Sequence, residues 1–344
     1  MPIRSLFPLL LLPLFVQGQP FRFEVDYSVR VSLDGQDLPN AWAGGLNAGQ
    51  FSTLHLDADS IPDLVVFDRT DGKLTAFVAK LAGGRYAYRH APEYEPLFPD
   101  LRFWLLLADY DHDGRKDAFT HTNLGVKVYR NVTQKAGELK WAVAREALYT
   151  RGYRDSVNLR VGAGDIPAIA DVDNDGDLDI LAYDQAGSYV EYHQNQSVER
   201  YGHARALEFR RVNACWGNFE EGAECGDFDF SVDCEATGRQ MNIEGPTRNV
   251  ESHRGRGAIR LGGTPPAGFF SSTGSPITGP PSGAAFAAGP PMQFFSSTVP
   301  TSLPDDRFRI QHAGSTLLAL DLDGDRDQDL LVGDVSCPTI FRMT

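Results

Sequence analysis

Short apolar runs bracket clusters of acidic residues in the middle of the chain. Trp104–Ala108 and Ala118–Thr120 bracket one cluster, and Ile166–Ala170 and Ile180–Tyr183 bracket a second. Apolar runs of this length between turn-forming residues predict β-strands, and no run with helical periodicity stands out. The pattern therefore predicts pairs of strands that are joined through acidic loops.

Two more strand candidates follow each pair. A third strand is expected after a glycine turn, at Gly125–Asn131 and Gly187–His193. A fourth is expected at Arg85–Arg89, Leu139–Val143 and Ala206–Arg210. Repetition of a four-strand unit is typical of a β-propeller, in which each unit forms one blade. We therefore predict an all-β fold of the β-propeller class.

The acidic loops have the composition of a metal site. Asp171, Asp173, Asp175 and Asp179 occupy the first, third, fifth and ninth positions of one loop, and Gly176 stands at its bend. This spacing lets a short loop direct several carboxylate oxygens at one hard cation, and Ca²⁺ takes about 6–8 oxygen ligands. The loop therefore predicts a calcium site inside a β-hairpin.

An EF-hand or a dockerin loop would begin in the same way. Its twelfth position would need a bidentate Glu, whereas the twelfth residue here is Ala182, and the flanking segments are expected to be strands rather than helices. Both of these alternatives are therefore excluded.

The same loop recurs along the chain. Asp109–Asp117 repeats the pattern in full, and Asp321–Asp329 repeats the acids with Arg326 in place of the bend glycine. A degenerate copy ends at Asp63 and has His55 at its first position. His55 is a poor calcium ligand, so we expect that copy to bind no ion and the other three to bind one structural Ca²⁺ each.

The stretches Leu105–Asn131 and Pro167–Asn195 resemble FG-GAP or VCBS repeats, the calcium-loop blades of integrin α-subunit heads and of many secreted bacterial proteins. In that family the seventh loop position supplies a backbone carbonyl. By matching position, the resemblance implies as ligands the side chains of Asp109, Asp111, Asp113 and Asp117 with the carbonyl of Arg115; of Asp171, Asp173, Asp175 and Asp179 with the carbonyl of Asp177; and of Asp321, Asp323, Asp325 and Asp329 with the carbonyl of Asp327.

A second resemblance concerns the C-terminal part of the chain. Cys215–Glu220, His312–Ala319 and Leu330–Val335 look like segments of large exported Bacteroidetes proteins, which carry such propellers ahead of a C-terminal sorting domain that is absent here. The expected organisation is a signal peptide at 1–18, three blade units at 19–212, a cysteine-bearing and low-complexity insert at 213–310, and a fourth, truncated blade unit at 311–344. About four blade units make an incomplete propeller.

The N-terminus has the pattern of a secretion signal. Arg4 precedes the apolar stretch Leu6–Val16, and Val16–Gly18 ends in small residues. We therefore predict a secreted or cell-surface protein.

The net charge of −14, or −15 once Arg4 is removed with the signal, argues against nucleic-acid partners, and no later segment predicts membrane insertion.

The predicted insert has two distinct parts. Residues 262–304 contain no charged residue and are rich in Gly, Pro and Ser, which predicts a disordered spacer. The four cysteines are Cys215, Cys225, Cys234 and Cys337. An even number in an exported chain predicts two disulfides with three possible pairings, of which Cys215 with Cys337 would tie the last unit back across the spacer.

No catalytic motif such as G-x-S-x-G, H-E-x-x-H or a P-loop occurs in the sequence, so we do not expect an enzyme. The most direct interpretation is an extracellular binding or adhesion module for a protein or a glycan. A propeller-type polysaccharide lyase and a truncated fragment of a larger surface protein are the alternatives. Two sequons, Asn131–Thr133 and Asn195–Ser197, have meaning as modification sites only in a host that glycosylates exported proteins.

Overall fold

The computed structural model describes Phe23 and residues 25–152, 155–230, 232, 259–260, 314–335 and 337–343. The predicted signal peptide and most of the predicted insert lie outside the described residues. The chain divides into two compact units, Met1–Gly45 and Leu46–Thr344. The first unit contains a hairpin of β1 (Ser32–Leu33) and β2 (Gln36–Asp37), whose turn residues Asp34 and Gly35 both have positive φ angles.

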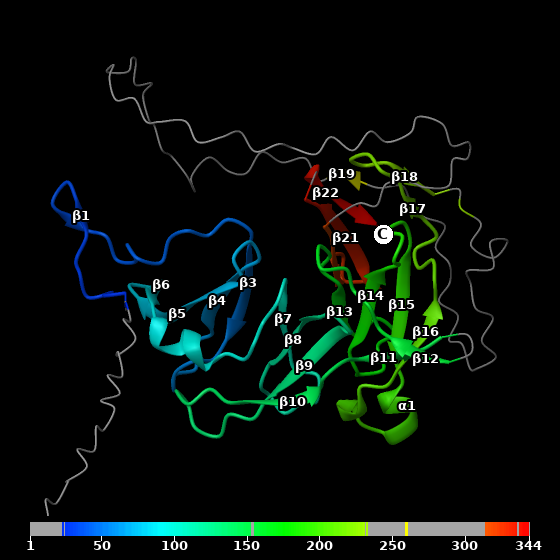
Figure 1. Cartoon of the computed structure of the whole chain (residues 1–344), viewed down its shortest axis with the longest axis horizontal. Helices are drawn as coiled ribbons and strands as arrows, with labels where there is room; N and C mark the ends of the chain where they lie inside the picture. Colours follow the sequence, from blue (N-terminus) through cyan, green and yellow to red (C-terminus); the bar gives the residue numbers. More distant parts are fainter. Residues whose placement is uncertain are drawn as a thin grey trace, which may run out of the picture. The chain divides into compact units, whose positions relative to one another are not determined.

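The second unit contains four small β-sheets that are arranged like the blades of a four-bladed propeller (Figure 1). Blade 1 consists of β3 (Gly49–Leu54), β4 (Asp63–Asp68), β5 (Lys73–Ala82) and β6 (Arg85–His90), paired antiparallel in chain order. A 3₁₀-helix, η1 (Pro92–Leu97), follows it. Blade 2 consists of β7 (Leu105–Ala108), β8 (Asp117–Thr122), β9 (Gly125–Asn131) and β10 (Trp141–Arg145), again in chain order. The predicted all-β, propeller-type fold is confirmed.

Blade 3 is larger than predicted. Its regular strands are β13 (Ala168–Ala170), β14 (Asp179–Tyr183), β15 (Val190–Asn195) and β16 (Phe209–Asn213), with α1 (Ser197–Tyr201) and the 3₁₀-helix η2 (Ala204–Ala206) between the last two. Two further strands, β11 (Tyr149–Arg151) and β12 (Ser156–Asn158), extend the sheet because β11 pairs in parallel with β16. Sequence patterns did not predict this extension, since three-residue strands leave too little periodicity to detect.

Blade 4 has a fourth strand that the sequence analysis did not expect. Its main strands are β20 (Ser315–Leu320), β21 (Asp329–Asp334) and β22 (Cys337–Met343). The outer position is taken by β19 (Ile259–Arg260), which pairs antiparallel with β22 although it comes from the predicted insert. The expectation of a truncated fourth blade therefore needs correction, because an upstream segment supplies its fourth strand.

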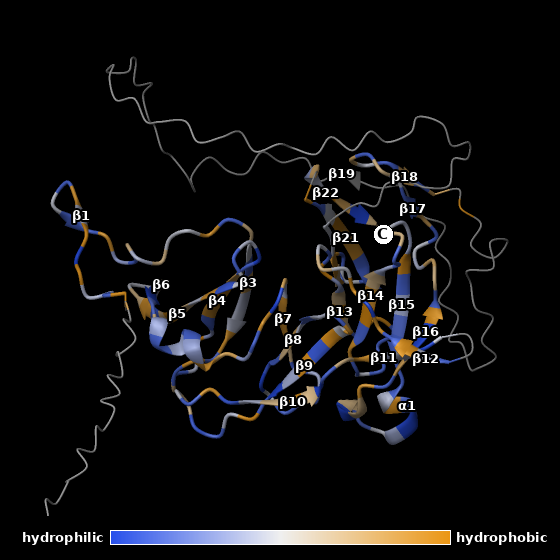
Figure 2. Cartoon of the chain, viewed as in Figure 1, coloured by the Kyte–Doolittle hydropathy of each residue, from blue (hydrophilic) through white to orange (hydrophobic). Residues whose placement is uncertain are grey.

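The hydrophobic core consists of clusters between consecutive blades. One cluster joins blade 1 to blade 2 and includes Phe67 and Leu105; a second joins blade 2 to blade 3 and includes Phe119 and Ile180. A third joins blades 3 and 4 and includes Leu330. Figure 2 shows hydrophobic residues in strands such as β14, and both hydrophilic and hydrophobic residues in the loops. Each blade thus buries its faces against its neighbours in the sequence, which is how a propeller stabilises small sheets.

One disulfide bond differs from the pairing that the sequence analysis singled out. Cys225 is bonded to Cys337, 112 residues further along the chain. Cys215 also forms a disulfide, and its partner lies outside the described residues. Of the three pairings that the sequence left open, the structure therefore excludes the one that contains a Cys215–Cys337 bond. Cys225 follows β17 (Glu220–Glu221) and precedes β18 (Phe228–Asp229), so this short hairpin is what the bond connects to blade 4.

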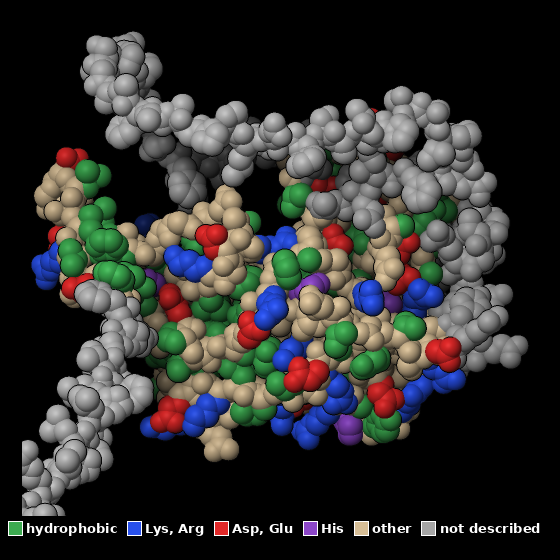
Figure 3. Space-filling model, viewed as in Figure 1, with side chains coloured by type: hydrophobic (Ala, Val, Ile, Leu, Met, Phe, Trp, Pro, Cys, Tyr) green, Lys and Arg blue, Asp and Glu red, His purple; other side chains and the backbone are tan. Residues whose placement is uncertain are grey.

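The surface carries both signs of charge. On the face shown in Figure 3, acidic and basic side chains are interspersed over the described residues. Within the described part of the chain, no helix has the length and apolar character needed to cross a membrane.

Candidate metal centres in the blade loops

The acidic loops connect the first and second strands of the blades. We call them loop 0 (55–63, blade 1), loop 1 (109–117, blade 2), loop 2 (171–179, blade 3) and loop 3 (321–329, blade 4). The ninth residue is an aspartate in all four, and all four are buried: Asp63, Asp117, Asp179 and Asp329. In every loop this carboxylate accepts a hydrogen bond from the backbone N–H of the second loop residue, at 2.7–3.2 Å. The ninth aspartate therefore closes each loop on itself.

Loops 1, 2 and 3 curve because two residues of each have left-handed backbone conformations. At the sixth position, φ is +84° for Gly114 and +98° for Gly176, and Arg326 has the same conformation with φ of +78°. At the fourth position, φ is +57° for His112, +60° for Asn174 and +83° for Gly324. Loop 3 therefore keeps the curvature of the other loops although it lacks the bend glycine.

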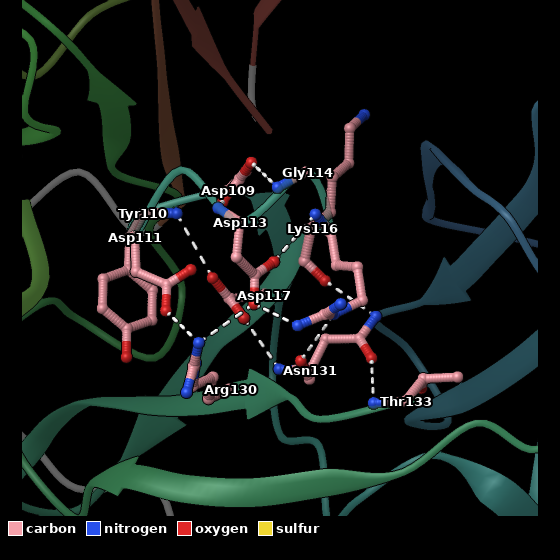
Figure 4. Close-up of polar contacts among 11 residues, drawn as sticks. Asp109, Tyr110, Asp111, Asp113, Gly114, Lys116, Asp117, Arg130, Asn131 and Thr133 are labelled. Atoms are coloured by element: carbon pink, nitrogen blue, oxygen red, sulfur yellow. Dashed lines mark hydrogen bonds and ion pairs between the residues drawn. The ribbon is translucent and has the colours of Figure 1, made fainter. Parts of the chain in front are cut away.

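Loop 1 brings three of its predicted ligands together (Figure 4). One carboxylate oxygen each from Asp109, Asp111 and Asp117 lies within 4.8 Å of the others. Asp111 is only 5% exposed, and its Oδ1 has no hydrogen-bond partner. Asp113 is instead paired with the guanidinium groups of Arg115 and Arg130.

Arg130 also lies 2.6 Å from Asp111, so an internal cation already neutralises part of loop 1. Burial raises the pKa of Asp117 to about 7, although the N–H groups of Asn131 and Tyr110 partly offset this effect. Loop 1 therefore combines converging carboxylates with a competing positive charge.

Loop 2 forms the most extensive acidic cluster. One carboxylate oxygen each from Asp171, Asp173 and Asp179 lies within 4.8 Å of the others, and the same holds for Asp173, Asp175 and Glu199. Glu199 comes from α1, outside the loop. In the described part of the chain, no Lys or Arg is paired with a loop 2 carboxylate; the neutral side chain of Gln194 donates to Asp173 instead.

The electrostatic cost of this cluster appears in its pKa values. Burial raises the pKa of Asp175 to about 7, and the nearby charges of Asp173 and Glu199 add to the shift. Burial raises the pKa of Asp177 to about 6, again with Glu199 contributing. The pKa of Asp179 also lies well above its usual value because the side chain is buried. A bound cation would favour the ionised carboxylates and offset this cost.

Loop 3 is the most exposed of the four. Carboxylate oxygens of Asp321, Asp323 and Asp325 lie within 4.8 Å of one another, and all three residues are exposed. The fourth predicted side-chain ligand, Asp329, lies outside that group; its carboxylate is 3.0 Å from Arg342, which also contacts Asp323 at 3.2 Å.

Loop 0 contains a cation of its own. The Lys80 ammonium group lies 2.7 Å from Asp57 and 2.6 Å from Asp59, the third and fifth positions of the loop. The hydrogen bond from Lys80 lowers the pKa of Asp59. Lys80 thus neutralises two of the acids of loop 0, and the expectation that this loop binds no ion stays a prediction.

Several residues of these centres were missed by the sequence analysis. Four of them lie on the third strand of their blades: Lys80, Arg130, Gln194 and Arg342. The fifth, Glu199, lies on α1. The four strand residues reach the loops through strand pairing, and the sequence of the loop motif gives no information about that pairing. The carbonyl ligands predicted at Arg115, Asp177 and Asp327 stay predictions.

The fold and loops together define a propeller-like protein with acidic clusters that could hold metal ions. Comparison of the chain with protein-family models, with curated proteins and with solved structures found no match.

Proposed function

We propose that this chain is an exported, calcium-stabilised β-propeller protein of FG-GAP/VCBS type, which binds an extracellular protein or glycan. The observation that carries the proposal is the recurrence of one nine-residue loop in three blades, each time with three carboxylate oxygens within 4.8 Å. Such a repeated arrangement of hard oxygen donors suits Ca²⁺, which accepts flexible, carboxylate-rich coordination.

The proposed role of the ions is structural. The carboxylates of Asp171, Asp173 and Asp179 repel one another in a half-buried loop. A bound Ca²⁺ would offset this repulsion, because each carboxylate is attracted to the cation. Each bound ion would fix the connection between the first two strands of a blade. A rigid set of loops is a suitable binding surface, since less conformational freedom is lost when a partner binds.

The three loops are expected to differ in affinity. Loop 2 has no paired Lys or Arg in the described structure, whereas Arg130 and Arg342 compete with an ion in loops 1 and 3. We therefore expect loop 2 to dominate calcium binding.

Thermal unfolding of the secreted chain in about 1 mM Ca²⁺ and in EDTA tests the proposal. A loop with Kd near ~10⁻⁴ M gains about 1.4 kcal/mol under these conditions, and three independent loops gain roughly 4 kcal/mol. We expect calcium to raise the melting temperature, and Asp173→Asn to remove the largest share of the increase. Asp57→Asn, in loop 0, is the matched control and should leave the increase unchanged. If the chain is folded but its melting temperature is the same in Ca²⁺ and in EDTA, the metal-site proposal is refuted.

The binding role needs a separate measurement. The calcium-loaded chain is screened against immobilised glycans and extracellular proteins, and any partner is retested in EDTA. Capture that is lost in EDTA and by Asp173→Asn would support a calcium-stabilised binding surface. If polysaccharide is cleaved instead, with new absorbance from unsaturated ends, the lyase alternative replaces the binding role.

A further inference from the structure

The two Asn-x-Ser/Thr tripeptides occupy the same structural position in two blades. Asn131 is the last residue of β9 and Asn195 is the last residue of β15, so each ends the third strand of its blade. Both lie directly beside the end of an acidic loop. Read as a motif, each tripeptide is a glycosylation sequon; the contacts indicate a different role.

Asn195 is tied to loop 2 by both its backbone and its side chain. Its backbone N–H donates to Oδ1 of Asp179 at 2.7 Å, and its Nδ2 donates to the carbonyl of Leu178 at 3.2 Å. Its Oδ1 accepts from the N–H of Ser197 at 3.2 Å and from the hydroxyl of the same residue at 2.5 Å. The residue is 1% exposed, so no part of the amide is available to solvent.

Asn131 makes the same contacts with loop 1 (Figure 4). Its backbone N–H donates to Oδ1 of Asp117 at 2.7 Å, and its Nδ2 donates to the carbonyl of Lys116 at 3.3 Å. Its Oδ1 accepts from the N–H of Thr133 at 3.1 Å. The residue is 3% exposed. The backbone N–H of the third residue of each tripeptide therefore binds the asparagine side chain, and in blade 3 the Ser197 hydroxyl does so as well.

Blade 1 shows which of these contacts depend on the asparagine side chain and which need only the backbone. Ala79 stands where the asparagines stand, and its N–H still donates to Asp63 at 2.8 Å. An alanine cannot hold the carbonyl of the eighth loop residue. This is the loop whose acids are paired with Lys80. The backbone bond thus occurs in blades 1, 2 and 3, whereas the amide contact occurs only beside loops 1 and 2 among these three.

We infer that Asn131 and Asn195 are positioning residues of the metal loops, which hold the eighth and ninth loop positions against the third strand of the blade. Hydrogen bonds to residues that carry ligands set their orientation and raise metal affinity. The inference rests on the proposed calcium binding. It also assigns both sequons a structural role in the folded chain, because each Nδ2 is buried and engaged.

The test is a calcium titration by calorimetry of the metal-stripped full chain, in a parent variant with Asp111→Asn and Asp323→Asn so that loop 2 dominates the signal. We expect Asn195→Ala to weaken calcium binding by about 10- to 100-fold, as for other residues that orient metal ligands. The matched control is Asn213→Ala. Asn213 also caps a turn at the end of a strand, by accepting from the N–H of Cys215 at 2.7 Å, and within the described residues its side chain makes no hydrogen bond to a metal loop.

The melting temperature of each metal-free variant separates positioning from simple stability. Both alanine variants should melt below the parent, while only Asn195→Ala should lose calcium affinity. If Asn195→Ala does not fold, the calcium affinity of Ser197→Ala tests the inference instead. This variant removes a single hydroxyl contact and should weaken calcium binding several-fold. Calcium affinities equal to that of the parent would overturn the inference. A parent that does not bind calcium would refute the proposed function instead, and the inference with it.

Discussion

Arg326 has the backbone conformation that glycine has in the other two loops. Its φ is +78°, beside +84° for Gly114 and +98° for Gly176. A residue with a Cβ in the left-handed region costs roughly 1–2 kcal/mol. Loop 3 therefore carries local strain, and the pairing of Asp321 with the Arg326 N–H, at 3.1 Å, helps to maintain it.

Replacing Arg326 by glycine should stabilise the chain. Relief of the left-handed strain is partly offset by the greater freedom of glycine in the unfolded chain, so a net gain of up to about 1 kcal/mol is expected. This corresponds to a rise of a few degrees in melting temperature, measurable by calorimetry in EDTA.

Gly176→Ala in loop 2 is the reciprocal variant. A Cβ at Gly176 meets no atom within 4 Å, so the backbone angle alone determines the effect. The variant should lose about 1 kcal/mol. Equal melting temperatures for Arg326→Gly, Gly176→Ala and the unmodified chain would show that φ at the sixth position does not limit stability.

In each blade, side chains of the third strand determine how the charge of the acidic loop is neutralised. Lys80 lies in β5 and pairs with loop 0, Arg130 lies in β9 and pairs with loop 1, and Arg342 lies in β22 and pairs with loop 3. In blade 3, Gln194 takes the place that Arg130 has in blade 2 and carries no charge. The same acidic loop can therefore be a metal site or a set of internal ion pairs, depending on one neighbouring strand.

Arg130→Gln should give loop 1 the neutral neighbour that loop 2 has. Arg130 contacts Asp111 at 2.6 Å and Asp113 at 3.0 Å. The Arg130 side chain is 38% exposed, so we take its pairing with the buried Asp111 to be worth about 1 kcal/mol, and its removal should tighten calcium binding by about fivefold. Calorimetric titration with loop 2 silenced by Asp173→Asn measures the change.

Arg89→Gln is the control, since Arg89 pairs with Glu93 away from every loop. It should leave the titration unchanged. Weaker calcium binding by Arg130→Gln would mean that Arg130 orders the loop rather than competing with the ion.

At the scale of the molecule, consecutive blades are joined by hydrophobic clusters and the last blade is also joined by covalent and polar links. Cys225 bonds to Cys337 across 112 residues. Loops 2 and 3 touch where Asn174 Nδ2 donates to the carbonyl of Arg326 at 3.1 Å. The edge of blade 4 depends on β19, from upstream in the chain. Blade 4 is therefore held by elements far from it in sequence.

Replacing Cys225 and Cys337 by serine should destabilise the chain by about 2–4 kcal/mol, because the bond closes a long loop in the unfolded state. The melting temperature should fall by about 5–10 °C. Hydrogen exchange provides the internal control: protection should fall most in β20–β22 and least in β7–β9. A uniform loss across all blades would indicate that blade 4 unfolds only together with the whole unit.

Local features of this protein were determined by the sequence itself. The apolar runs around each acidic loop are found as strands, β9 has the predicted bounds Gly125–Asn131, and the loop acids converge as their spacing indicates. These features depend on residues within about ten positions of one another. Their hydrogen bonds and alternation are encoded in a short window.

Only the tertiary structure decided which loops are neutralised from within, which cysteines pair, and where the outer strand of blade 4 originates. Lys80, Arg130 and Glu199 reach the loops through strand register or a neighbouring helix, and β19 reaches β22 from a distant part of the chain. Such contacts are selected by packing among many possible partners. No local pattern singles them out, which is why the loop motif could be predicted while the differences between its copies could not.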